Sequence, residues 1–208
     1  MMKPARWILT LAIGLGLGVG ITWWVMKPPK IRNGVTAIVP GVLYRSGQLD
    51  PEDLQQQIDL RGIKTVVNLG STKDWDAAVC QANGVKYIRV PVGDVWQMDG
   101  LPNPEANGKV FPKPDLSAVW RAIDDPAARP VLIHCWGGTH RTGVFVAKYR
   151  IEQQGWSARD AIDEMKLFGF DTSDPKFAGV LNYLRQHQPP QTANTPATQP
   201  IAAGSNAQ

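Results

Sequence analysis

Two residues of the segment VLIHCWGGTHRTG, at 131–143, have the chemistry of a nucleophile and of an anion clamp. Cys135 can supply a thiolate, and Arg141, six residues later, a planar guanidinium that can hold two oxygens of one phosphate. Gly137 and Gly138 between them permit positive φ values and close approach of the backbone. We therefore predict that the backbone amides of this loop converge on an anion. The same amides and the guanidinium favour the thiolate form of Cys135.

The loop itself supplies the remaining candidate residues. The predicted phosphate-binding residues are Trp136, Gly137, Gly138, Thr139, His140 and Arg141. Trp136 directly follows the nucleophile and either forms the rim of a pocket or packs against the domain. His140 either contacts a substrate or faces solvent. A buried structural cysteine is the alternative interpretation of Cys135, but it leaves the two glycines and Arg141 unexplained.

The elements that must position this loop form an alternating pattern. Short apolar or β-branched runs predict strands at 35–39, 42–44, 63–69, 85–90 and 130–135, and caps with apolar periodicity predict helices at 51–62, 72–83, 116–123, 142–154, 158–168 and 175–187. Strands that alternate with helices indicate one α/β domain with a central, mostly parallel sheet flanked by helices. The strand at 130–135 would deliver Cys135 to the loop, and the next helix would begin near Thr142.

The chain divides into three parts. Residues 1–32 are predicted to be a membrane anchor with basic flanks, residues 33–188 the α/β domain, and residues 189–208 a disordered tail. The uncharged run at 7–26 has 20 residues, and a helix of that length spans about 30 Å, the thickness of the bilayer hydrocarbon. We expect a single-pass protein of a bacterial inner membrane. A cleavable signal peptide is the alternative, and basic residues on both sides of the run leave the catalytic side open.

The net charge carries no information about a nucleic-acid partner. The chain has 22 Lys and Arg against 18 Asp and Glu, and five of the basic residues lie in the first 32 positions, which contain no acid. Residues 33–208 therefore carry 22 − 5 = 17 basic and 18 acidic side chains, a formal charge of −1. The two cysteines and three histidines lack paired metal-ligand spacing. We predict neither a metal nor another cofactor, and no nucleic-acid partner.

The loop resembles a known signature. HC-x5-R-[ST]-G after an apolar strand is similar to the signature of the protein tyrosine phosphatase superfamily, and the short domain is similar to its dual-specificity branch. LYRSGQL at 43–49 also resembles a segment of small bacterial phosphatases of this type. The resemblance covers about residues 35–187 and implies that Cys135 is the nucleophile and Arg141 the phosphate clamp. It also implies that Thr142 places a hydroxyl beside the sulfur and that His134 supports the loop. Arg45 and Ser46 are expected to be structural.

Such a phosphatase needs a proton donor for the leaving oxygen. In the family this Asp follows the strand before the phosphate-loop strand, which points to Asp94 in the run YIRVPVGD. Asp94 lies 41 residues before Cys135, a long gap that a Pro- and Gly-rich inserted loop at 97–113 accounts for. Asp99 within that loop is the alternative acid, and Asp115 is interpreted as a helix cap.

The resemblance implies a membrane-anchored, cysteine-dependent phosphatase that acts on phosphate monoesters through a cysteinyl-phosphate intermediate. Phosphotyrosine, phosphoserine and phosphothreonine proteins are the expected substrates. The alternatives are a lipid or inositol phosphate phosphatase, a catalytically silent phosphate-binding module, and thiol redox or sulfur-transfer chemistry. The loop interior contains no lysine, which argues against polyphosphorylated inositols. Cys80 is interpreted as a core residue, with a disulfide to Cys135 as the other possibility.

Overall fold

The structure is a computed structural model that describes residues 34–70 and 75–187. These ranges cover most of the domain predicted at 33–188. The predicted membrane anchor and the predicted tail lie outside the described residues. Across the described ranges, no helix is both long enough and apolar enough to span a membrane.

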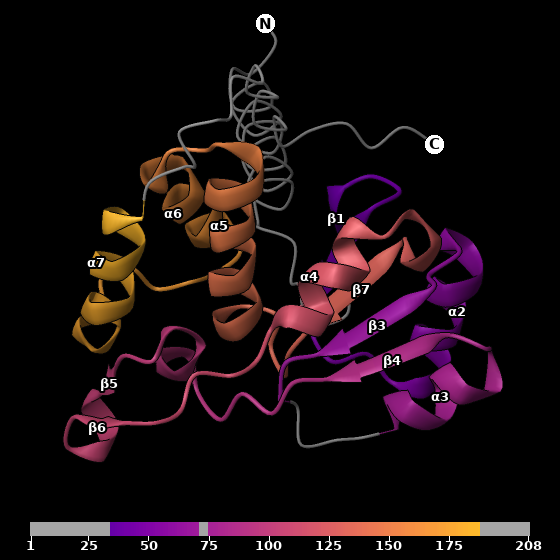
Figure 1. Cartoon of the computed structure of the whole chain (residues 1–208), viewed down its shortest axis with the longest axis horizontal. Helices are drawn as coiled ribbons and strands as arrows, with labels where there is room; N and C mark the ends of the chain where they lie inside the picture. Colours follow the sequence, from indigo (N-terminus) through magenta and orange to yellow (C-terminus); the bar gives the residue numbers. More distant parts are fainter. Residues whose placement is uncertain (1–33, 71–74, 188–208) are drawn as a thin grey trace, which may run out of the picture.

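A five-stranded sheet forms the centre of the domain (Figure 1). Its strands are β1 (Thr36–Val39), β2 (Leu43–Ser46), β3 (Thr65–Asn68), β4 (Lys86–Arg89) and β7 (Val131–His134), in the order β1-β2-β7-β3-β4. β1 pairs antiparallel with β2, and every other pair is parallel. The prediction of a mostly parallel α/β sheet is confirmed. β7 is the central strand, which accounts for its uninterrupted apolar sequence.

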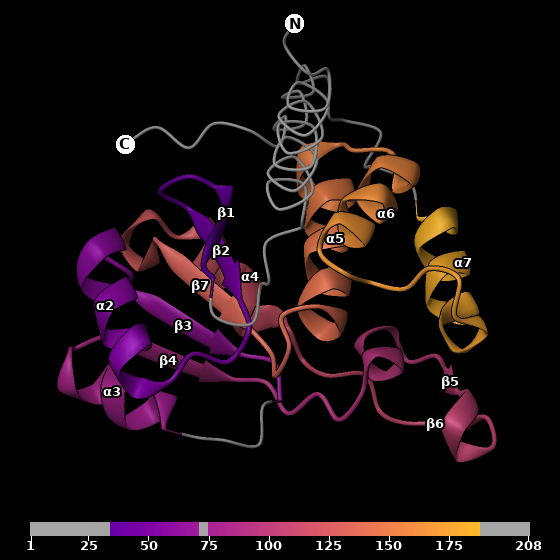
Figure 2. The same ribbon diagram turned by 180° about the vertical axis from the view of Figure 1, so that it is seen from behind.

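Helices cover both faces of the sheet. They are α2 (Pro51–Arg61), α3 (Asp76–Ala82), α4 (Ser117–Asp124), α5 (His140–Gln154), α6 (Ala158–Leu167) and α7 (Ala178–Gln186). Successive side chains of a strand point to opposite faces, so Val66 and Leu132 pack with α2 and α3. Val67 and Ile133 pack in a second core with residues of α4 to α7. Figure 2 shows α5, α6 and α7 grouped at the end of the sheet toward which β3 and β4 point.

Local signals explain the helix boundaries. Asp50 caps α2 by accepting a hydrogen bond from the backbone N–H of Asp53 at 2.9 Å, and Pro51 occupies the first helical position. Gly62 ends the helix in the left-handed conformation with φ 62°. Ser157 caps α6 in the same way as Asp50 caps α2. The helix predicted at 51–62 is therefore confirmed together with both of its end signals.

Three features of the structure differ from the sequence-based expectations. α5 begins at His140 rather than near Thr142, which places Arg141 in the first turn of the helix. The helix predicted at 175–187 is divided into a 3-10 turn, η4 (Pro175–Phe177), and α7. The inserted loop at 97–113 contains structure of its own: the end of η1 (Val95–Asp99), η2 (Pro104–Ala106) and the small antiparallel pair β5 (Pro102–Asn103) and β6 (Lys109–Val110). Elements of two or three residues are too short to produce a periodic pattern.

Candidate active site

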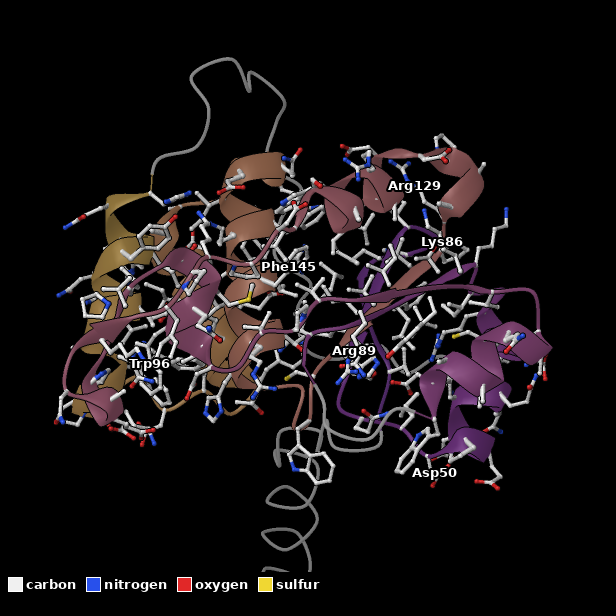
Figure 3. The ribbon with its side chains drawn as sticks, turned by 60° about the horizontal axis from the view of Figure 1, so that its bottom comes forward. Asp50, Lys86, Arg89, Trp96, Arg129 and Phe145 are labelled. Atoms are coloured by element: carbon white, nitrogen blue, oxygen red, sulfur yellow. The ribbon has the colours of Figure 1, made fainter. Side chains whose placement is uncertain are left out.

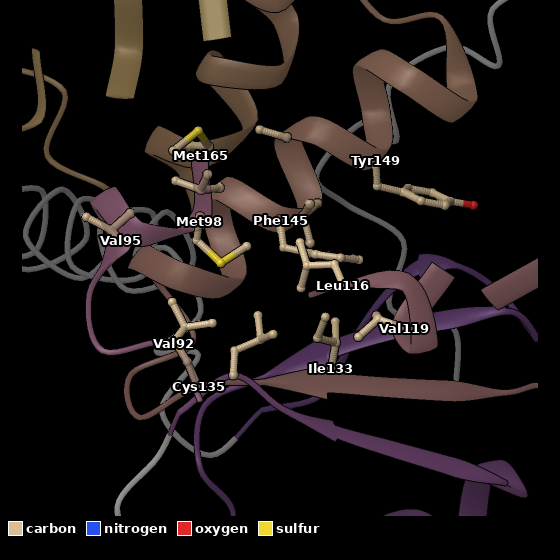
Figure 4. Packing of buried hydrophobic residues seen from close by; sticks show 14 of the residues in the cluster. Val92, Val95, Met98, Leu116, Val119, Ile133, Cys135, Phe145, Tyr149 and Met165 are labelled. Carbon is tan, nitrogen blue, oxygen red and sulfur yellow. The ribbon is translucent and has the colours of Figure 1, made fainter. Parts of the chain in front are cut away.

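Cys135 lies where the central strand ends. It directly follows β7, between the carboxyl ends of β2 and β3. Its side chain is 3% exposed and belongs to the core between the sheet and α5, and Figure 4 shows it near Val92 and Ile133. The fold therefore holds the thiol at the bottom of the site, at the edge of the sheet where ligands of open α/β folds bind.

The loop from Cys135 to α5 is packed tightly against the end of β2. Gly138 has φ +69°, and a Cβ there would lie 2.7 Å from both Ser46 O and Gly47 N. Only glycine fits this position, as predicted. Gly137 is different, since its φ is not positive and a Cβ there would meet nothing within 4 Å. Of the two glycines, only Gly138 therefore has a positive φ and a close contact with the described residues.

Further contacts fix the loop at both of its flanks. The N–H of Gln48 donates to the carbonyl of Trp136 at 3.1 Å, and the Thr139 hydroxyl donates to the carbonyl of Phe168 at 3.3 Å. Trp136 itself is 47% exposed, which fits the rim position better than packing. Thr142 is buried, and its hydroxyl has no hydrogen-bond partner among the described residues. One backbone and one side-chain hydrogen bond thus attach the loop to neighbouring segments.

His140 is exposed at the start of α5. One side of its ring lies against Phe170 and Phe177, with centroid distances of 5.4 and 5.0 Å. Partial burial and the nearby Lys176 charge lower the pKa of His140, and the charge of Asp94 acts in the opposite direction. His140 is exposed, as the solvent-facing alternative predicts. It lies on a helix, however, and not in a loop.

Arg141 connects three segments of the site. Its Nη1 donates to the carbonyls of Gly70, at 2.8 Å, and Leu69, at 3.3 Å, both just after β3. Its Nη2 donates to the carbonyl of Gly93 at 2.8 Å. The guanidinium therefore connects the start of α5 to the end of β3 and to the segment that carries Asp94. The structure brings Arg141 and the Asp94 segment together although 47 residues separate them in sequence.

Asp94 is the N-cap of η1. Its Oδ1 accepts a hydrogen bond from the Val95 N–H at 2.6 Å, and Gln97 completes a capping box. Trp96, which is labelled in Figure 3, secures this short helix. Its Nε1 donates to the carbonyl of Lys176 at 3.1 Å, and its ring stacks on Phe177. Asp94 is half-buried. It directly follows Gly93, whose carbonyl accepts a hydrogen bond from Arg141. It therefore lies one residue from the contact with Arg141, and its charge acts on His140.

Asp99, the alternative acid, is engaged elsewhere. Its Oδ1 accepts from the Nζ of Lys148 on α5 at 2.7 Å, and both side chains are buried. The ammonium of Lys148 also donates to the Tyr183 hydroxyl on α7 at 3.1 Å. Burial lowers the pKa of Lys148, but the hydrogen bond and charge of Asp99 outweigh it and hold that pKa above its ordinary value. Asp99 is therefore part of a buried ion pair that fastens the end of η1 to α5.

A polar network behind the loop was not foreseen from the sequence. Asp76 of α3 is buried and lies with Oδ2 3.3 Å from Nε2 of His134. It also accepts hydrogen bonds from the side-chain amides of Gln48, at 2.8 Å, and Asn68, at 2.9 Å. His134 thus lies next to a buried carboxylate, although neither of its ring nitrogens forms a hydrogen bond within the described residues. The one local signal for this network was Asn68, a polar residue near the end of the apolar run IKTVVNL.

Comparison with known proteins decides the family. Residues 47–186 match the model of the dual specificity phosphatase catalytic domain. The dual specificity protein phosphatase TpbA of Pseudomonas aeruginosa is 51% identical over 184 residues, which cover 83% of this chain and 77% of that protein.

The chain belongs to the dual specificity phosphatase family.

Other relatives share part of this sequence or its fold. The inositol diphosphatase SIW14 of Saccharomyces cerevisiae is 28% identical over 135 residues, which cover 64% of this chain and 44% of that protein. The crystal structure of its core catalytic domain with citrate covers 78% of this chain and 88% of its own, with TM-score 0.56 and 22% identity. The crystal structure of Pseudomonas aeruginosa TpbA covers 73% of this chain and 88% of its own, with TM-score 0.52 and 27% identity.

The predicted phosphatase resemblance is confirmed, and the chain is an enzyme of this family. In this dual specificity phosphatase the two cysteines are free and lie in different cores, so the disulfide between Cys80 and Cys135 is absent. Burial, and then the charge of Asp76, raise the pKa of Cys80 to about 12. Within the described residues, no group of three or more His, Cys, Asp or Glu side chains is arranged to hold a metal ion.

Proposed function

We propose that this phosphatase hydrolyses phosphate monoesters on proteins, with phosphotyrosine, phosphoserine and phosphothreonine as substrates, through a cysteinyl-phosphate intermediate. One observation carries the assignment: Arg141 joins the loop that follows Cys135 to the carbonyl of Gly93, directly before Asp94. This contact supports a single site that contains the candidate nucleophile, the candidate phosphate clamp and the candidate acid.

Each residue has a role in a two-step reaction. The thiolate of Cys135 attacks phosphorus, the bond to the leaving oxygen breaks, and Asp94 donates its proton to that oxygen. The carboxylate of Asp94 then accepts a proton from water as the water oxygen attacks phosphorus, the S–P bond breaks, and inorganic phosphate and the thiolate are released. Backbone amides of the loop and the guanidinium of Arg141 stabilise the charge on the equatorial oxygens in both steps.

Two observations favour protein substrates over inositol phosphates. TpbA, at 51% identity, is named a dual specificity protein phosphatase, whereas the inositol diphosphatase relative is 28% identical. The loop from Trp136 to His140 contains no lysine, so it lacks cations for a second phosphate. An exposed Trp136 at the rim provides an aromatic surface for the phenyl ring of phosphotyrosine.

The substrate class is tested by measuring phosphate release from matched panels in the presence of EDTA. Phosphotyrosine, phosphoserine and phosphothreonine peptides form one panel, and phosphoinositide vesicles and soluble inositol polyphosphates form the other. We expect kcat/KM for the best phosphopeptide to exceed that for every inositol compound by at least about tenfold, a difference of 1.4 kcal/mol in transition-state binding. The reverse order would assign the enzyme to lipid or inositol phosphates.

The acid is tested by its dependence on the leaving group. Asp94→Asn should lower kcat for a phosphotyrosine peptide about 100-fold, the usual scale of a general acid. Its effect on p-nitrophenyl phosphate should be far smaller, because nitrophenolate leaves without a proton. Asp99→Asn is the matched control. Breaking its buried ion pair with Lys148 should lower the free energy of unfolding in urea by about 3 kcal/mol, but it should leave the ratio of kcat for the two substrates unchanged. If Asp99→Asn alone changes that ratio, Asp99 is the acid.

We also propose that residues 7–26 anchor the enzyme in a membrane. The support is the uncharged 20-residue run with tryptophans at both ends and basic residues beyond them. The full chain should then stay with the membrane fraction through an alkaline carbonate wash, and a variant lacking residues 2–32 should not. Release of the full chain by carbonate would refute the anchor.

A further inference from the structure

Arg45 is a buried cation beneath the phosphate loop. It lies on β2, next to β7 in the sheet, and its register partner is Ile133, two residues before Cys135. The side chain is 0% exposed. Because Leu43, two residues earlier, packs in the core beneath α5, Arg45 points to the same face of the sheet. The positive charge therefore lies on the α5 side of the sheet, under the loop.

The contacts of Arg45 are directed at the loop and its supports. Its Nη2 donates to the carbonyl of Gly138 at 2.7 Å, and the guanidinium carbon lies 4.0 Å from the ring centroid of Phe168. Phe168 also accepts, through its carbonyl, the hydrogen bond from Thr139. The guanidinium thus holds the Gly138 carbonyl toward the interior of the domain, which leaves the amides of the loop free to face the opposite side.

No carboxylate in the described part of the chain forms an ion pair with Arg45. Glu164 of α6 is near enough to influence it, but its two oxygens accept from Arg150 at 2.6 and 3.0 Å. Nε and Nη1 of Arg45 are buried without a hydrogen-bond partner among the described residues. Burial lowers the pKa of Arg45 to about 10, and the charges of Glu164 and then Cys135 oppose that shift. The residue therefore keeps its charge at neutral pH.

A buried cation without a paired anion is costly for the fold. The anions that the mechanism brings to this place are the Cys135 thiolate and the phosphoryl group. We propose that Arg45 is a positioning residue of the active site, which orients the loop through Gly138 and provides a fixed positive charge behind the thiolate and the bound phosphate. This inference deepens the proposed phosphatase function and rests on it.

Several other titratable or charged side chains surround the loop and must stay unchanged when Arg45 is replaced. They are Asp76 of α3, Asp94 ahead of η1, His134 of β7, Arg141 and Arg150 of α5, and Glu164 of α6. The substitutions Arg45→Gln and Arg45→Lys leave all of them in place. Arg45→Gln keeps a side-chain donor for Gly138 and removes the charge, while Arg45→Lys keeps the charge and removes the planar fork.

The experiment measures alkylation of Cys135 by iodoacetamide as a function of pH, with the adduct located by mass spectrometry. Arg45→Gln should shift the profile to higher pH and slow alkylation at pH 7 about tenfold, because the thiolate loses a nearby positive charge. The concentration of inorganic phosphate that half-protects Cys135 should rise by a similar factor. Arg45→Lys should stay within about threefold of the wild type in both measurements.

Arg150→Gln is the matched control, since it neutralises another buried arginine of the same core that is already paired with Glu164. It should lower the urea midpoint without moving the alkylation profile.

Arg45→Gln removes a buried charge and adds none, so we expect it to fold, and circular dichroism checks this. Equal profiles for Arg45→Gln and Arg45→Lys, or an equal shift in Arg150→Gln, would overturn the proposal. Neither readout needs turnover, so a chain that binds phosphate but does not hydrolyse it would refute the proposed function and leave this test intact.

Discussion

Cys135→Ser should abolish hydrolysis while leaving the fold and phosphate binding intact. We expect kcat for a phosphotyrosine peptide to fall at least about 10^4-fold, the scale on which removal of a catalytic nucleophile acts. The reason is chemical, because a serine hydroxyl does not ionise at neutral pH and is a far weaker nucleophile than a thiolate. Its oxygen fits the space of the sulfur at a position that is 3% exposed, so the loop keeps its shape.

The measurement compares two serine variants in the presence of EDTA. Cys80→Ser is the matched control, since Cys80 is also buried but lies in the other core, beneath α2 and α3. Its raised pKa keeps it protonated at neutral pH, so its loss should cost stability and not turnover. Phosphate release should vanish only in Cys135→Ser. If Cys135→Ser retains more than a tenth of wild-type turnover, or if Cys80→Ser loses as much, the cysteinyl-phosphate mechanism is wrong.

The strand, loop and helix that carry Cys135 and Arg141 were predictable because their signal is local. An apolar strand, a glycine-containing loop and a helix start lie within 131–143, and each is recognised from neighbouring residues alone. The sheet followed from the same kind of signal, since β-branched runs mark β3 and β7. The two end signals of α2, Asp50 and Gly62, were likewise correct.

The supporting contacts were not predictable because they join residues far apart in sequence. Arg45 meets Gly138 across 93 positions, and Lys148 meets Asp99 across 49. Nothing in the run LYRSGQL shows that its arginine is buried, since arginine is mostly exposed in proteins. The surroundings of Asp94 and Asp99 depend on the same missing information: the sequence places both in one segment, and the structure shows that only Asp99 is paired with Lys148.

Substitution of Arg141 should have the second large effect on turnover. In Arg141→Lys we expect kcat/KM to fall at least about 100-fold, as for the loss of one preorganised donor to a transition-state oxygen, although the charge is kept. Lysine is a compact cation and cannot replace a fork that reaches the carbonyls of Gly70 and Gly93 together. Arg141→Met should fall further, by about 10^4-fold, because the charge is lost as well.

Arg61→Lys is the matched control for Arg141→Lys. Arg61 ends α2, and its Nε donates to the Gln57 side chain at 2.7 Å, with no contact to the site. Kinetics of both lysine variants should be measured with a phosphotyrosine peptide, together with the inhibition constant for inorganic phosphate. Because Arg141 also holds the segment that carries Asp94, Arg141→Lys should slow hydrolysis of the phosphotyrosine peptide more than that of p-nitrophenyl phosphate, which a simple loss of phosphate affinity would not do. An Arg141→Lys enzyme with raised KM but unchanged kcat would show that this residue binds substrate without aligning the acid.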